Sequence, residues 1–245
     1  MDNFLKEGER LDDLEQSNLK IIQNPSKFCF GMDAVLLTGF IKIKVNEEVV
    51  DLGTGTGIIP ILLTAKTKAK HYYALEIQAD MADMAARSVA YNHIEDKIDV
   101  ICGDIKEASK LLKSGNFDVV TCNPPYMNDM HGLKNPDEAL AIARHEIKCN
   151  LDDIIREGAK LLKSGGRYYM VHRPHRLIEI FMTMKNYGLE PKRICMVHPY
   201  ADKEANMVLI EAVKGGGAWM KVEAPIVVYK EPGKYTQQIY DIYGY

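Results

Sequence analysis

The sequence lacks several features that would each direct its interpretation. The 245-residue chain has five cysteines and no CxxC pair, which argues against a structural zinc site and favours reduced thiols. No apolar run reaches the roughly 18 residues that a membrane-spanning helix needs. The charged segment 1–13 has no apolar core, so it is not a signal peptide. We therefore expect a cytoplasmic protein with neither a metal site nor a membrane attachment.

An excess of positive charge is also absent. The 31 lysines and arginines stand against 34 aspartates and glutamates, for a net charge of −3. Overall charge will not attract phosphate, so any contact with nucleic acid must come from a local basic patch.

What the sequence does have is an alternation of short apolar strands and helices from residue 49 onward. Strands are expected at 49–52, 71–76, 98–102, 117–122, 167–171, 192–198 and 206–213. Helices are expected at 58–66, 79–91, 105–113, 137–147, 151–163 and 175–187. Asn150 or Asp152 can cap the helix at 151–163, and Gly165-Gly166 is expected to stop it. This order predicts an α/β fold, a three-layer sandwich with a mostly parallel sheet covered on both faces.

The two ends of the chain are expected to differ from the middle. Only a short loop separates the last two strands, which predicts an antiparallel hairpin at one edge of the sheet. Near the N-terminus, Leu19–Ile22 is a strand candidate, and a helix is expected after Asp33 as its N-cap. We therefore expect an N-terminal extension (1–45) packed on the core, a central α/β domain (46–214) and a tyrosine-rich C-terminal arm (215–245).

A glycine loop follows the first core strand, in the segment Asp51-Leu-Gly-Thr-Gly-Thr-Gly57. Glycines allow positive φ and let a ligand approach the backbone. A dinucleotide fingerprint would need a third glycine at position 58, which is isoleucine, and the Gly-Lys-Ser/Thr of a P-loop is absent. The spacing instead resembles the loop of Rossmann-like S-adenosylmethionine-dependent methyltransferases. A glycine-rich turn without a ligand is the structural alternative.

Two acidic residues at the ends of the next strands strengthen the prediction of a cofactor site. Glu76 lies 23 residues after Gly53, close to the offset of roughly 20 at which a carboxylate can accept the ribose hydroxyls of a bound cofactor. Asp104 follows the third strand, where it could accept from the adenine amino group while Ile105 packs on the ring. Because parallel strands end at one edge of a sheet, we expect these side chains near the glycine loop.

The turn Asn123-Pro-Pro-Tyr126 ends the fourth strand. The two prolines fix φ and remove two backbone donors, which leaves the neighbouring carbonyls free as acceptors. A planar amine or amide NH₂ is a weak nucleophile, and its hydrogens must be held so that its lone pair faces the methyl group. The Asn123 side-chain oxygen and the Pro124 carbonyl can supply two acceptors, and Tyr126 can stack on a flat substrate. Catalysis would come from alignment and desolvation and would need no metal.

Together these motifs resemble the amino-methyltransferases. The stretch Phe30-Gly-Met-Asp-Ala-Val-Leu-Leu37 ahead of the glycine loop resembles bacterial tRNA1(Val) adenine-N6-methyltransferases. The resemblance implies S-adenosylmethionine as cofactor, tRNA as partner and an adenine N6 as acceptor. It further implies that catalytic and cofactor-binding roles fall on the following residues: catalytic Asn123, Pro124 and Tyr126; cofactor-binding Asp51, Gly53, Thr54, Gly55, Gly57, Glu76, Asp104, Ile105 and Asn123.

Other functions stay open from the sequence. A protein-glutamine N5-methyltransferase shares the pattern, although only about 48 residues precede the first core strand. An rRNA amino-methyltransferase and a non-catalytic cofactor- or RNA-binding partner are further alternatives. If tRNA is the substrate, the phosphate contacts are expected from Arg173 and Arg176 with Arg144 and Lys148. The oligomeric state is not determined by the sequence.

Overall fold

The centre of the molecule is a sheet to which widely separated parts of the chain contribute. The computed structural model describes residues 4–15, 17–27, 29–124 and 149–244. In these residues the sheet has nine strands: β3 (Glu48–Leu52), β4 (His71–Glu76), β5 (Ile98–Cys102), β6 (Phe117–Cys122), β7 (Leu162–His172), β8 (Leu189–His198), β9 (Met207–Lys214), β10 (Lys221–Val222) and β11 (Ile226–Val227). The strand order is β10-β8-β9-β7-β6-β3-β4-β5, and β11 also pairs with β8.

The parallel half of the sheet brings four strand ends to one edge. The strands β7, β6, β3, β4 and β5 run parallel to one another. In this register Leu52 lies opposite both Leu75 and Cys122, and Glu76 lies opposite Cys102. The loops that follow β3, β4, β5 and β6 therefore leave the sheet side by side.

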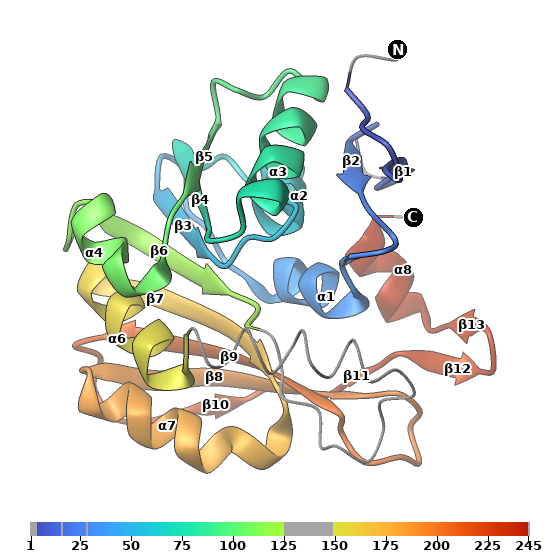
Figure 1. Ribbon diagram of the computed structural model, residues 1–245. Coiled ribbons are helices and arrows are strands. Elements are labelled where there is room, and N and C mark those ends of the chain that lie inside the picture. Colours follow the sequence, from blue (N-terminus) through green and yellow to red (C-terminus); the bar gives the residue numbers. More distant parts are fainter. Residues whose placement is uncertain (1–3, 16, 28, 125–148, 245) are drawn as a thin grey trace.

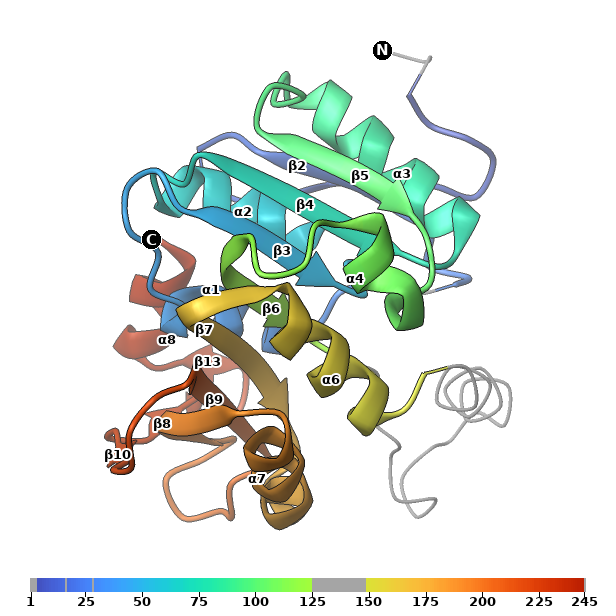
Figure 2. The same cartoon turned by 90° about the vertical axis from the view of Figure 1, so that its left-hand side faces the viewer.

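Helices cover both faces of the sheet, as Figures 1 and 2 show. The helical elements are α1 (Met32–Phe40), α2 (Ile58–Lys66), α3 (Ala79–Tyr91), η1 (Ile105–Glu107), α4 (Ala108–Leu111), α6 (Leu151–Leu161), η2 (Pro174–Arg176), α7 (Leu177–Asn186) and α8 (Gln237–Tyr243). Successive strand residues alternate between the two faces: Val49 and Val119 pack with α1 and α2, whereas Val50 and Val120 pack with α6 and α7. This confirms the predicted three-layer α/β sandwich.

The two terminal segments both pack on this sandwich. The hairpin of β1 (Arg10–Asp13) and β2 (Lys20–Gln23) lies against α3, where the Ile22 N–H donates to Ser88 Oγ at 2.9 Å. The C-terminal arm adds β10 and β11 beyond β8, then forms the hairpin of β12 (Tyr229–Glu231) and β13 (Lys234–Tyr235). Its last helix, α8, packs on α1. The division at residues 45 and 214 stays a proposal.

Several expected boundaries differ from the structure. The helix at 151–163 ends at Leu161, and β7 begins at once and runs through Gly165-Gly166. The glycines therefore do not stop the helix. They lie where the β6–β7 register shifts, and Gly165 takes φ +77°. The chain turns into the sheet earlier because Leu162 is fully buried there.

Two predictions concerned helix caps and two concerned whole helices. Asn150 does cap α6, in a capping box with Asp153. Asp33 does not cap α1, because Gly31 is the N-cap and Asp33 lies in the first turn. The helix expected at 105–113 is divided into η1 and α4. The helix expected at 137–147 lies outside the described residues.

The antiparallel hairpin of β8 and β9 is confirmed, with β10 and β11 added outside it. Within the described part of the chain, no helix is long and apolar enough to cross a membrane.

Candidate active site

The glycine loop connects the end of β3 to the start of α2 in a backbone conformation that needs glycine. Gly53, Gly55 and Gly57 have φ of +72°, +59° and +87°, values that side chains with a Cβ rarely adopt. The N–H groups of Gly53 and Thr54 donate to the Leu75 carbonyl at 2.9 and 3.0 Å. The loop is thereby fixed to the neighbouring strand β4.

The three glycines serve different purposes. A Cβ on Gly57 would lie 3.3 Å from the Ala85 Cβ, so this glycine lets the start of α2 approach α3 closely. A Cβ on Gly53 would lie 3.6 Å from Ile105 Cδ1. A Cβ on Gly55 would meet only Met81 Cε, at 3.9 Å. The backbone at Gly55 is therefore the most open part of the loop, as ligand binding requires.

Glu76 joins the loop to the end of β4. Its carboxylate accepts from the Gly55 N–H and from the Gln78 N–H, both at 2.9 Å, and the residue is only 5% exposed. The Gln78 side-chain Nε2 also donates to this carboxylate, at 3.4 Å. A carboxylate has about four acceptor positions, so one remains for a ligand. Sequence reasoning placed Glu76 at the site but did not foresee that it also supports the loop.

Asp51 lies beneath the loop as a buried acid. It is 2% exposed, and its Oδ1 accepts from Thr121 Oγ1 at 2.5 Å. Burial raises the pKa of Asp51 to about 6, against the opposing hydrogen bond from Thr121. The Thr54 hydroxyl is near enough to favour the charged form, yet Oδ2 has no partner of normal hydrogen-bond geometry. A cationic ligand would stabilise this carboxylate, and a sulfonium cofactor with an ammonium group fits that requirement.

Asp104 and Ile105 follow β5 beside the loop. Asp104 caps η1, where Oδ1 accepts from the Lys106 N–H at 2.9 Å. The Gly103 N–H donates to the Glu76 carbonyl at 2.9 Å, which ties this turn to β4. Because Ile105 also lies next to Gly53, the turn after β5 and the glycine loop form one continuous surface.

Asn123 and Pro124 follow β6, the strand on the other side of β3. Asn123 is partly exposed and Pro124 is buried. The end of β6 thus lies next to the start of the glycine loop. Pro125, Tyr126, Arg144 and Lys148 lie outside the described residues.

The basic segment after β7 lies at the same edge. His172 is 2% exposed, and burial lowers its pKa to about 4, so it is neutral near pH 7. Arg176 makes a two-bond ion pair with Glu179, at 2.8 and 2.6 Å. Arg173 Nη1 donates to the Asn206 carbonyl at 2.8 Å. The link from Arg173 to the β8–β9 loop was not foreseen, because it depends on β9 pairing with β7.

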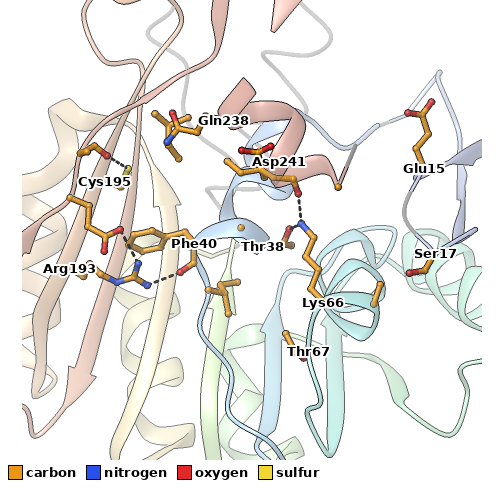
Figure 3. Close-up of a pocket in the computed structure, with 18 residues that line it drawn as sticks. Glu15, Ser17, Thr38, Phe40, Lys66, Thr67, Arg193, Cys195, Gln238 and Asp241 are labelled. Carbon is orange, nitrogen blue, oxygen red and sulfur yellow. Dashed lines mark hydrogen bonds and ion pairs between the residues drawn. The ribbon is translucent and has the colours of Figure 1, made fainter. Parts of the chain in front are cut away.

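A cavity of about 750 Å³ lies elsewhere, and none of the predicted site residues that the structure describes lines it. Its walls come from the ends of α1 and α2, from β8 and the connection between β10 and β11, and from α8 (Figure 3). Lys66 donates there to Thr38 Oγ1 and to the Ile242 carbonyl, both at 2.9 Å. Lys66 and Thr38 bind each other there, as do Arg193 and Glu223, and the size of the cavity alone does not make it the active site.

The sequence of the chain matches known methyltransferases. Residues 19–187 match the family model described as methyltransferase small domain. A tRNA1(Val) (adenine(37)-N6)-methyltransferase from Bacteroides fragilis is 30% identical over 168 residues, covering 68% of this chain and 69% of that protein. One of the same name from Aeromonas salmonicida is 26% identical over 85% of both chains.

Solved structures share the fold. A predicted O-methyltransferase from Agrobacterium tumefaciens superposes with a TM-score of 0.69 at 23% identity, covering 86% of this chain and 95% of that one. A geranyl diphosphate C-methyltransferase from Streptomyces coelicolor, solved with S-adenosyl-L-homocysteine, gives 0.56 at 16% identity, over 75% of both chains.

Fold and sequence together define an S-adenosylmethionine-dependent N-methyltransferase. More particularly, the chain belongs to the methyltransferase small-domain family and, within it, to the tRNA1(Val) (adenine-N6)-methyltransferases.

Proposed function

We propose that the protein transfers a methyl group to the exocyclic N6 of an adenine in tRNA. The observation that carries this proposal is a strand pairing in the sheet. The strand β6, which is followed by Asn123-Pro124, pairs directly with β3, which is followed by the glycine loop. An acceptor amine held after β6 would therefore face a methyl donor held after β3. The names of the relatives supply the tRNA and the adenine.

The residues at this edge would divide the work. The Gly53–Gly57 loop, Thr54, Glu76, Asp104 and Ile105 would hold the cofactor, with Asp51 facing its positive charge. S-adenosylmethionine supplies an electrophilic methyl group when bound. The Asn123 side-chain oxygen and the Pro124 carbonyl would accept hydrogen bonds from the amine and orient its lone pair. Tyr126 would stack on the base.

The target adenine must leave its stack to reach such a site. Base flipping makes a single-stranded loop the favoured substrate, because its bases unstack at a lower cost. We also propose that Arg173 and Arg176, with Arg144 and Lys148, contact the phosphates. A tRNA substrate is consistent with the expected cytoplasmic location.

Mass spectrometry of tRNA nucleosides tests the function. A strain without this protein should lose N6-methyladenosine from one tRNA, and the purified protein with S-adenosylmethionine should restore it. Unchanged N6-methyladenosine in that strain, together with methylation of a protein glutamine in vitro, would instead support the protein-amide alternative.

A further inference from the structure

Five tyrosines from three separate segments form one continuous aromatic group. Tyr200 lies in the β8–β9 loop, Tyr229 and Tyr235 pair across the β12–β13 hairpin, and Tyr240 and Tyr243 lie on α8. Ring centroids are 5.5 Å apart for Tyr200–Tyr229, 5.2 Å for Tyr229–Tyr235, 6.0 Å for Tyr235–Tyr240 and 6.3 Å for Tyr235–Tyr243. We call this group the tyrosine column.

The Tyr200 end of the tyrosine column lies at the same edge of the sheet as the active site. Both β7 and β8 pair antiparallel with β9, so they run in the same direction and end at the same edge. The column begins there, because Tyr200 follows the end of β8 and the Tyr229 N–H donates to the Pro199 carbonyl at 2.9 Å. In Figure 1 the β12–β13 hairpin lies on the side to which the arrowhead of β6 points.

A continuous path joins the column to Asn123. Three strand-to-strand steps separate the ends of β6 and β8, roughly 15 Å at the usual strand spacing. Midway along this path, Arg173 at the end of β7 donates to the Asn206 carbonyl of the loop that carries Tyr200. A few nucleotides on either side of a base bound at Asn123 can reach this distance.

The charge around the column favours bases over phosphates. In the β8–β9 loop Lys203 is paired with Asp202 at 3.1 Å, and in the hairpin Lys234 is paired with Glu231 at 2.7 Å. A surface of aromatic rings with little net charge attracts the faces of nucleobases, which stack on aromatic side chains whatever their sequence.

Tyr200 differs from the tyrosines behind it. Tyr229, Tyr235 and Tyr243 pack against the main hydrophobic core, whereas Tyr200 belongs to none of the core clusters of the described residues. Tyr200 is partly exposed, and within the described part of the chain Tyr229 is the one ring packed on it. The core-packed tyrosines thus hold the column in place, and Tyr200 is the end on which a further aromatic ring can stack.

We propose that the tyrosine column is a docking surface for single-stranded RNA, and that an unstacked base near the target adenine stacks on Tyr200. This inference rests on the proposed function for the identity of the RNA. It makes Tyr200 a residue for substrate binding, outside the catalytic and cofactor-binding groups.

The experiment measures RNA binding separately from methylation. The Tyr200→Ala, Tyr200→Phe and Tyr200→Trp variants are titrated with a fluorescently labelled stem-loop RNA whose loop contains adenine, and with total tRNA in a methylation assay. Tyr187→Ala is the matched control, since Tyr187 is also partly exposed but lies at the opposite end of β8, where its hydroxyl donates to Asp152 at 2.8 Å.

We expect Tyr200→Ala to weaken stem-loop binding about 5- to 100-fold, the range for loss of one base–aromatic stack. Its KM for tRNA should rise by a similar factor while kcat at saturating tRNA and the affinity for S-adenosylmethionine stay unchanged. Tyr200→Phe, Tyr200→Trp and the Tyr187→Ala control should bind RNA as the wild type does.

Two results would overturn the proposal: wild-type RNA affinity in Tyr200→Ala, or a Tyr200→Phe variant as weak as Tyr200→Ala. The proposed function is judged independently, by whether the wild-type protein methylates tRNA adenine. Stem-loop binding that depends on the ring, without tRNA methylation, would sustain the column and reject the function.

Discussion

The glycine-loop edge and the cavity near Arg193 are stabilised by different kinds of interaction. At the edge, main-chain N–H groups of Gly53, Thr54 and Gly55 bind the Leu75 carbonyl and the Glu76 carboxylate. The cavity is stabilised by side chains. Arg193 donates to Glu211 at 2.7 Å, to Glu223 at 3.1 Å and to the Phe40 carbonyl at 2.7 Å.

The glycine-loop edge has groups left to bind a ligand, whereas Arg193 of the cavity is already paired with carboxylates. At the edge Gly55 leaves open space and Asp51 keeps an oxygen without a normal hydrogen bond, which leaves binding capacity for a ligand. In the cavity the buried charge of Arg193 is already balanced by two carboxylates and by the Phe40 ring, 3.7 Å from its guanidinium carbon. Substitutions at the edge should therefore change activity, and substitutions in the cavity should change stability.

The strongest test is Gly55→Val, which should abolish S-adenosylmethionine binding. A β-branched side chain would occupy the open space and resist φ of +59°. Isothermal titration calorimetry measures the binding. Gly115→Val is the matched control, since Gly115 has φ +67° with no atom within 4 Å of an added Cβ. It should lose stability from the same backbone strain but bind the cofactor normally; equal affinity in both variants would contradict the assignment of the loop.

Arg193→Met tests the cavity and should destabilise the fold by about 3 kcal/mol, because it leaves Glu211 and Glu223 without their buried partner. Denaturant unfolding measures this loss. Cofactor affinity should be unchanged at temperatures where the variant is folded. A selective loss of cofactor affinity at full stability would show that the cavity takes part in binding.

Asp51→Asn tests the buried acid through pH. The pKa of Asp51 is raised from 3.8 to about 6, so the stability that its proton contributes is complete below pH 3.8 and is lost as the pH rises through 6. That loss is about 3 kcal/mol for a shift of two units. The Asn variant does not titrate, so its stability relative to the wild type should rise by about this amount between pH 4 and pH 7. If the difference in unfolding free energy between the two proteins stays constant across this range, the pKa of Asp51 is not raised by folding.

Asn123→Ala should lower turnover by about 100-fold or more, the range for loss of one oriented polar group in a transition state. Cofactor affinity should stay nearly intact, since Asn123 lies after β6 and outside the glycine loop. Single-turnover kinetics with saturating cofactor separate the two effects. An equal loss of cofactor affinity and turnover would mean that Asn123 acts through cofactor binding alone and would remove its proposed catalytic role.

Glu76→Ala is expected to have the smallest effect, a loss of about 1–3 kcal/mol in cofactor affinity, because it removes charge-assisted hydrogen bonds. Part of this loss comes from the loop, since the Gly55 and Gln78 N–H groups lose their acceptor. Glu76→Gln keeps one acceptor oxygen and should lose less by calorimetry. If both variants bind as the wild type does, Glu76 supports neither the loop nor the ligand.

The sequence by itself determined the residues of the edge and their order. Only glycine readily adopts positive φ at positions 53, 55 and 57, and only the ends of parallel strands bring Glu76, Asp104 and Asn123 to one edge. Both constraints are local or follow from strand alternation, and so they can be read from spacing. The capping of α6 by Asn150 was predictable for the same reason.

The tertiary structure decided what depends on distant neighbours. Gly57 serves helix packing because Ala85 of α3 lies against it, and Gly165-Gly166 lies within a strand because β7 pairs with β6. The raised pKa of Asp51 arises from burial under the loop, and the tyrosine column forms only where the C-terminal arm meets the end of β8. Burial and strand pairing join residues far apart in the chain, and no local pattern in the sequence specifies those pairs.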